Sequence, residues 1–234
     1  MTSAPAHSNF IQRLDEIHVL ISLCSPADAS IEETIKNLQR DKSLSRAAMV
    51  LLCSHVEGFF EELIGDVLQF HETNKTSVNA LPLRLKTTQL WNIVGVSDTA
   101  SDARKWAIIQ ALRKSVIADD GSQCDIGILN QELHTKGFAN PGSNDVARLL
   151  STVGVDDVWG MLEAAGLGLL KNSLDAIVGR RNPIAHGDAN AAATPNDVEQ
   201  YVKDMLTLAS EISGITAQHL QSSSGVSDPW LLLI

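Results

Sequence analysis

A short polar stretch brings together side chains that could cleave a phosphodiester. From Arg181 to Gly187 the chain reads RNPIAHG, so an amide follows the arginine directly and His186 follows it five residues later. A guanidinium is permanently charged and offers a planar fork of donors to phosphate. Histidine is the side chain best suited to transfer protons near neutral pH. Held in one pocket, Arg181 and His186 could therefore cleave a phosphodiester without a metal ion.

RNA suits this pair because it carries its own nucleophile, the 2′-hydroxyl. When a base removes that proton, the oxygen attacks the adjacent phosphorus and leaves a cyclic phosphate and a free 5′-hydroxyl. We expect His186 to be the general base or acid, Arg181 to stabilise the phosphorane charge, and Asn182 to orient His186 or the phosphate. No cofactor is expected, because this route needs no metal and no carboxylates with two-metal spacing are evident. The alternative is a chance arrangement of a helix-end arginine and a surface histidine.

Helical segments flank the stretch on both sides. An apolar run predicts a helix over 167–181, and Thr194 with Pro195 predicts the start of a long helix that reaches about residue 219. On a regular helix, side chains five residues apart point about 140° apart. Pro183 restricts Asn182, so we expect the helix to end near Asn182 and the bend to bring Arg181 and His186 together. Alternatively, Pro183 only stops the helix.

The rest of the chain also has helical rather than strand periodicity. The predicted helices are 8–24, 31–40, 43–71, 101–118, 125–135, 144–153, 167–181 and 195–219. These segments predict an all-α fold in which 44–71, 167–181 and 195–219 share one core. We expect an N-terminal arm at 1–7, one helical domain at 8–220, and a linker with an apolar tail at 221–234. The tail from Pro229 is unusually apolar for exposure to water, so we expect it to dock in an apolar groove of its own dimer or of a partner. The alternative is a disordered chain end.

Composition narrows the functional classes. The formal charge of −10 argues against nonspecific coating of nucleic acid, although one local basic region is present. That region, which is either a basic face or an ordinary solvated surface, contains Arg84, Lys86, Arg104, Lys105, Arg113 and Lys114. Cys24, Cys53 and Cys124 lie far apart without metal-site spacing, which favours free thiols in a reducing cytosol. We see neither a signal peptide nor a membrane-length apolar run, so a cytoplasmic protein without a membrane partner is expected.

The segment 174–187, LDAIVGRRNPIAHG, resembles the signature of HEPN-domain endoribonucleases, in which a short spacer joins an arginine and a polar residue to a histidine. The segment 46–63 is similar to the early helix of a bacterial RiboL-PSP-like HEPN group. The resemblance covers most of residues 8–220 and implies a single HEPN-like bundle with additional helices. It also implies a homodimer in which two motifs face one groove, since one histidine cannot easily serve as both base and acid. Supporting candidates for this groove are Arg180, Glu57 and His55, of which Glu57 is the better candidate for contacting Arg181.

Three functions remain open at this stage. The intact Arg181 and His186 favour an endoribonuclease that acts on RNA as a toxin or phage-defence effector, with an antitoxin or regulatory protein as a further partner. A non-catalytic HEPN module that binds nucleotide or a partner protein is the second hypothesis. The third is a helical regulatory or scaffold protein in which the motif is a coincidence.

Overall fold

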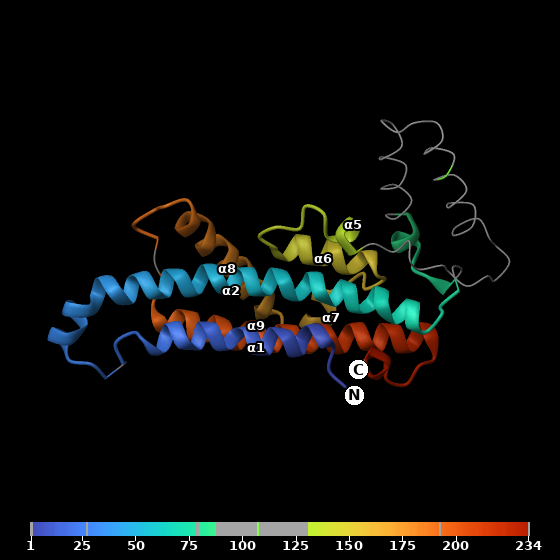
Figure 1. Cartoon of the computed structure of the whole chain (residues 1–234), viewed down its shortest axis with the longest axis horizontal. Helices are drawn as coiled ribbons and strands as arrows, with labels where there is room; N and C mark the ends of the chain where they lie inside the picture. Colours follow the sequence, from blue (N-terminus) through green and yellow to red (C-terminus); the bar gives the residue numbers. More distant parts are fainter. Residues whose placement is uncertain are drawn as a thin grey trace.

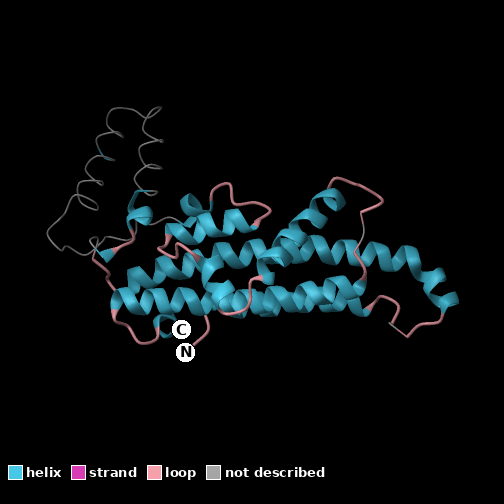
Figure 2. Cartoon of the chain, turned by 180° about the vertical axis from the view of Figure 1, so that it is seen from behind, coloured by secondary structure: helices cyan, strands magenta, loops and turns pink. Residues whose placement is uncertain are grey.

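The computed structural model describes residues 2–26, 28–77, 80–87, 107, 131–191 and 193–233. Its elements are α1 (Pro5–Ser22), α2 (Ile31–Thr73), α5 (Gln131–Thr135), α6 (Ser143–Thr152), α7 (Val158–Ala164), α8 (Leu169–Ala185), α9 (Pro195–Ser224) and the 3-10 helix η3 (Pro229–Leu233). No strand occurs among these described residues, and the all-α prediction is confirmed (Figure 2). Three features of the sequence analysis lie outside these described residues. They are the predicted helix 101–118 except for residue 107, four of the six residues of the basic region, and Cys124.

Three long helices form the body of the molecule. Helices α1, α2 and α9 lie side by side along the long axis, α8 packs against α2, and α6 contacts α8 (Figure 1). Helix α2 contacts α1, α8 and α9, and α8 also contacts α9. The prediction that 44–71, 167–181 and 195–219 share one core is therefore confirmed, and α1 completes that core.

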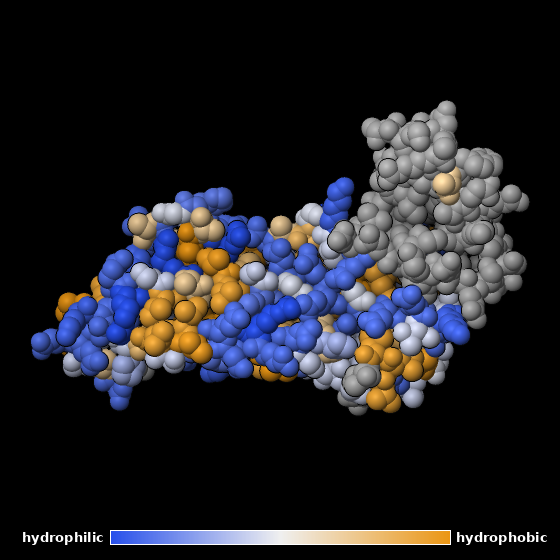
Figure 3. Space-filling model, in the orientation of Figure 1, coloured by the Kyte–Doolittle hydropathy of each residue, from blue (hydrophilic) through white to orange (hydrophobic). Residues whose placement is uncertain are grey.

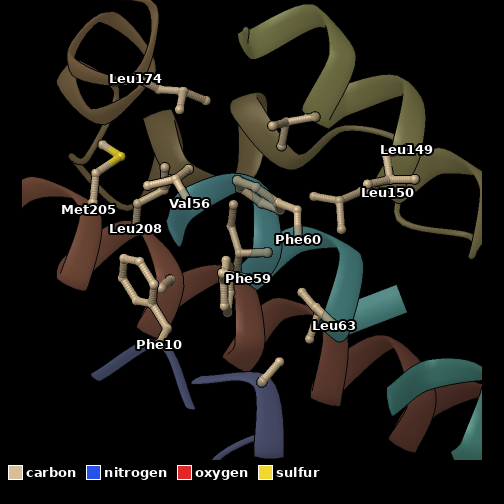
Figure 4. Packing of buried hydrophobic residues seen from close by; sticks show 14 of the residues in the cluster. Phe10, Val56, Phe59, Phe60, Leu63, Leu149, Leu150, Leu174, Met205 and Leu208 are labelled. Atoms are coloured by element: carbon tan, nitrogen blue, oxygen red, sulfur yellow. The ribbon is translucent and has the colours of Figure 1, made fainter. Parts of the chain in front are cut away.

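Aromatic side chains of α2 pack in the centre of the bundle. Phe59 and Phe60 are each 1% exposed, and their ring centroids lie 5.1 Å apart. The Phe59 ring also lies 5.5 Å from the ring of Phe10 in α1 (Figure 4). Since such buried ring pairs add to the free energy of apolar burial, this cluster fixes α1 against the middle of α2.

The structure joins two predicted helices into one. The helices expected at 31–40 and 43–71 form the single helix α2, which is 43 residues long. The Ser30 side chain caps its start by accepting a hydrogen bond from the Glu33 N–H, and two glutamates occupy the first turn. The polar residues near 40 interrupt the apolar pattern. They include no glycine or proline, so the backbone continues as a helix.

Smaller differences concern the ends of other helices. Helix α1 begins at Pro5, so the expected arm 1–7 contains its first turn. Helix α6, expected at 144–153, runs from Ser143 to Thr152 with Gly142 as its N-cap, and the Ser143 hydroxyl donates to Asp175 Oδ2 of α8 at 2.8 Å. Asp157 is the N-cap of α7, and its side chain accepts from the Gly160 N–H.

The two termini lie next to each other at one end of the bundle (Figure 1). The Thr2 N–H and hydroxyl donate to Asp228 Oδ2 at 2.8 and 2.7 Å. Trp230 is 1% exposed, and its ring N–H donates to the Ser213 carbonyl at 3.4 Å. The apolar tail thus docks on α2 and α9 of its own chain. Leu231 and Leu232 stay exposed, and apolar surface is visible near the C-terminus (Figure 3).

A buried carboxyl group joins α1 to α2 and makes stability depend on pH. Asp66 is 9% exposed, accepts the Ala6 N–H at 2.8 Å, and has its pKa raised by burial to about 6. The native state therefore binds this proton more tightly than the unfolded chain does. Ionisation of Asp66 lowers the free energy of unfolding as the pH rises, and this loss is complete above about pH 6. We expect Asp66→Asn, which keeps the acceptor oxygen, to raise the free energy of unfolding by about 1–3 kcal/mol at neutral pH. The gain should shrink as the pH falls towards about 4.

Urea unfolding of the parent and of Asp66→Asn at several pH values measures this effect. Exposed Asp15 of α1 provides a matched control, and Asp15→Asn should change the free energy of unfolding little at any pH. A gain from Asp66→Asn that is the same at acid and neutral pH would contradict the assignment to Asp66 ionisation.

Candidate functional site

The polar stretch forms the C-terminal end of α8. Contrary to the expectation from the sequence, the helix does not end near Asn182, because Pro183 lies inside it and helical geometry continues to Ala185. A proline removes one helical hydrogen bond, here the bond that would end at the Gly179 carbonyl. Gly179 is exposed, so water can reach that carbonyl in place of the missing donor. The buried Ile184 side chain fixes the last turn to the core.

A glycine turn ends the helix directly after His186. His186 is the C-cap, and Gly187 has the left-handed φ of 85° that glycine adopts without steric cost. The Gly187 N–H donates to the Ile184 carbonyl at 3.1 Å, and the Asp188 N–H donates to the Pro183 carbonyl at 3.0 Å. This pair of bonds is a Schellman motif. It fixes the backbone that carries His186, whose side chain is exposed to solvent.

Arg181 lies on a different side of α8 from His186. Its side chain is half-buried and donates to Asn182 Oδ1 at 3.3 Å. Burial raises the pKa of the Cys53 thiol in α2 to about 11, while the nearby Arg181 charge opposes that rise. Arg181 therefore lies toward α2. Since the helix is regular to Ala185, Arg181 and His186 are about 140° apart around its axis and roughly 7.5 Å apart along it. The expected bend that joins the two side chains within one chain is absent.

Glu57 lies on the same side of α2 as Cys53. Its charge raises the pKa of Cys53, so Glu57 and Arg181 both lie near this thiol. Its Oε2 accepts the N–H of Asn140, a residue with a left-handed φ of 55°. Among the described side chains, no ion pair joins Glu57 directly to Arg181. Glu57 is thus near the arginine of the motif and fixes the turn before α6.

His55 and Arg180 face other neighbours. His55 Nε2 lies 3.4 Å from Glu16 Oε2 of α1, and burial lowers the pKa of His55. Residues 55 and 57 point about 200° apart on a helix, which places His55 away from the Glu57 side. Arg180 Nη1 lies 3.4 Å from Asp197 Oδ2, and its guanidinium lies 5.7 Å from the Tyr201 ring centroid. Arg180 therefore joins α8 to the first turns of α9.

The model of the RiboL-PSP-HEPN family matches residues 8–218 of the chain, from α1 to α9. The protein belongs to the RiboL-PSP-HEPN family. The resemblance seen in the sequence is confirmed at the level of the family. Membership indicates a nuclease-type or nucleotide-binding module. No curated protein and no solved structure matches the chain.

The RiboL-PSP-HEPN bundle contains one contact to the motif that sequence reasoning missed. Arg46 of α2 is half-buried, and its guanidinium donates to the backbone carbonyls of Ile184, Asp188 and Ala191. The Ile184 bond is 3.4 Å long. Arg46 opens the segment that resembles the early HEPN helix, but nothing in its local sequence indicates a contact more than a hundred residues away.

The described part of this RiboL-PSP-HEPN chain contains neither a metal-binding cluster nor a membrane-spanning helix. No group of three histidine, cysteine, aspartate or glutamate side chains there is arranged to hold a metal ion. None of the described helices combines the length and the apolar character that crossing a bilayer requires.

Proposed function

We propose that this RiboL-PSP-HEPN protein is a metal-independent endoribonuclease that acts in the cytoplasm. The observation that carries the proposal is the end of α8, where an arginine, an amide and an exposed histidine lie within six residues on a fixed backbone. This combination supplies a phosphate-binding cation and a proton-transfer group. RNA supplies the nucleophile through its 2′-hydroxyl.

Each residue of the motif has a distinct part in this reaction. His186 is accessible to solvent and transfers a proton, either from the 2′-hydroxyl or to the leaving 5′-oxygen. Arg181 stabilises the negative charge of the phosphorane. Asn182, whose Oδ1 accepts a hydrogen bond from Arg181, orients the guanidinium. Glu57 lies near Arg181 and supports it by charge, whereas Arg180 and His55 contribute to the fold around the site.

A second copy of the chain would complete such a site. In one chain Arg181 and His186 point to different sides of α8, and one histidine cannot easily be both base and acid. A homodimer with two motifs at one groove provides a second histidine and a second arginine. We propose this homodimer as the active form and a toxin or phage-defence effector as the role, with an antitoxin or regulatory protein as its partner.

A non-catalytic module that binds nucleotide or a partner protein is the second candidate. The continuation of α8 past Pro183 favours it, because a single chain does not bring Arg181 and His186 together. Arg181 would then hold a phosphate without any proton transfer.

Incubation of the purified protein with a structured RNA distinguishes the two functions. We expect cleavage products with 2′,3′-cyclic phosphate and 5′-hydroxyl ends, at a rate that EDTA does not change. Light scattering on the same sample should give the mass of a dimer. Cleavage that stops on chelation would contradict the metal-independent mechanism, and nucleotide binding without cleavage would support the second candidate.

A further inference from the structure

Arg46 connects the middle of the bundle to the backbone around His186. Its Nη1 donates to the carbonyls of Asp188 and Ala191, and its Nη2 donates to that of Ile184. One of these carbonyls precedes His186 in the chain and two follow it. The guanidinium therefore holds the helix end on both sides of the histidine.

The segment after α8 has few other polar contacts. In the described residues they are local: the Asn190 N–H donates to Asp188 Oδ1 at 2.8 Å, and the Asp188 N–H donates back to Pro183. The segment passes the N-terminal half of α2 on its way to α9 (Figures 1 and 2). Arg46 is therefore its polar anchor to a distant element, beside the apolar contact that Ala191 makes with the core.

Arginine is well suited to this position for two reasons. A planar guanidinium presents five N–H donors, and its fork can reach several carbonyls that a single ammonium group cannot hold in the same geometry. The last carbonyls of a helix also carry a partial negative charge, which a cation stabilises. Because the donors of Arg46 point to backbone carbonyls, its geometry differs from that of a phosphate ligand.

We propose that Arg46 is a positioning residue for His186. It fixes the backbone on both sides of the C-cap and thereby sets where the imidazole meets the scissile phosphate. This inference rests on the proposed ribonuclease function. A displacement of about 1 Å in a reacting group can reduce a rate about 100-fold, so a loosened helix end would act on turnover rather than on RNA binding.

The test compares Arg46→Met, which keeps most of the apolar stem, with Arg46→Lys and with a control, Arg40→Met. Arg40 lies on the same helix, is largely exposed, and pairs with Asp41. Two measurements are made on each purified full-length protein. The first is kcat and KM for one RNA substrate, and the second is hydrogen exchange at the amides of His186, Gly187 and Asp188, all of which are hydrogen-bonded.

We expect Arg46→Met to lower kcat about 10- to 100-fold with KM within about threefold. Exchange at the three amides should rise about tenfold or more, while core amides such as those of Leu52 and Leu63 stay protected. Arg46→Lys should recover part of kcat, and Arg40→Met should change neither measurement. The conservative Arg46→Lys keeps the test possible if Arg46→Met does not fold.

Three outcomes would overturn the inference. One is unchanged exchange at His186, Gly187 and Asp188, and another is faster exchange with an unchanged kcat. The third is a raised KM at constant kcat, which would make Arg46 a substrate ligand. A parent protein that does not cleave RNA would instead overturn the proposed function, and the exchange data alone would then decide whether Arg46 holds the helix end.

Discussion

Replacing His186 with alanine is expected to abolish RNA cleavage, with a rate about 10²–10⁴ times lower than that of the parent. The expected loss is chemical because His186 is an exposed C-cap whose side chain fills no part of the core. Alanine keeps the backbone and leaves Gly187 free to form its turn. RNA binding should change little, so the effect should appear in single-turnover rates at saturating protein.

Exposed His18 of α1 gives the matched control for this prediction. His18→Ala should cleave RNA at the parental rate, and both variants should unfold at temperatures close to that of the parent. A folded His186→Ala protein that cleaves RNA as fast as the parent would exclude His186 from the reaction. The non-catalytic module would then be the better account of the motif.

The bundle was predictable because its helices carry their own signals. Thr194, Pro195 and Asp197 form a capping box with proline at the first helical position, and α9 begins where these residues place it. Apolar residues recur at helical spacing along 44–71, and the same residues form the core in the structure. The predicted boundary between 31–40 and 43–71 is wrong because polar residues interrupt the apolar pattern there without a glycine or proline to end the helix.

The end of α8 shows what local sequence does not determine. Pro183 disfavours helical geometry at Asn182, but the burial of Ile184 and the two bonds of the Schellman motif offset this preference. Gly187 was the available signal for a helix end at His186. A glycine directly after the last helical residues is a typical C-terminal signal, and it coincides with the observed end of α8.

Contacts between distant segments were the least predictable part of the site. The bonds of Arg46 span 138 to 145 residues, and only the packing of α2 against α8 makes them possible. By contrast, the separation of His55 from Glu57 follows from helical periodicity, since residues two apart face different sides. The motif itself was readable because it is contiguous, whereas the residues that hold it come from other helices.

Arg181→Ala is expected to reduce RNA cleavage about 10²–10³-fold and also to weaken RNA binding, unlike His186→Ala. Loss of a cation that stabilises charge in a transition state typically costs this factor. Binding should suffer too because the same guanidinium contacts the phosphate before the reaction. Arg181→Lys should retain part of the binding and less of the rate, since an ammonium keeps the charge but not the planar fork.

The control for Arg181 is Arg148, an exposed arginine of α6 that pairs with Asp145 in its own helix. Arg148→Ala should leave both cleavage and binding at parental values. The double variant Arg181→Ala/His186→Ala should cleave RNA little more slowly than the worse single variant, because residues that act as one unit lose their effects non-additively. If the fold-reduction in cleavage rate of the double variant equals the product of the two single reductions, Arg181 and His186 act separately. The shared site across two copies of α8 would then have no support.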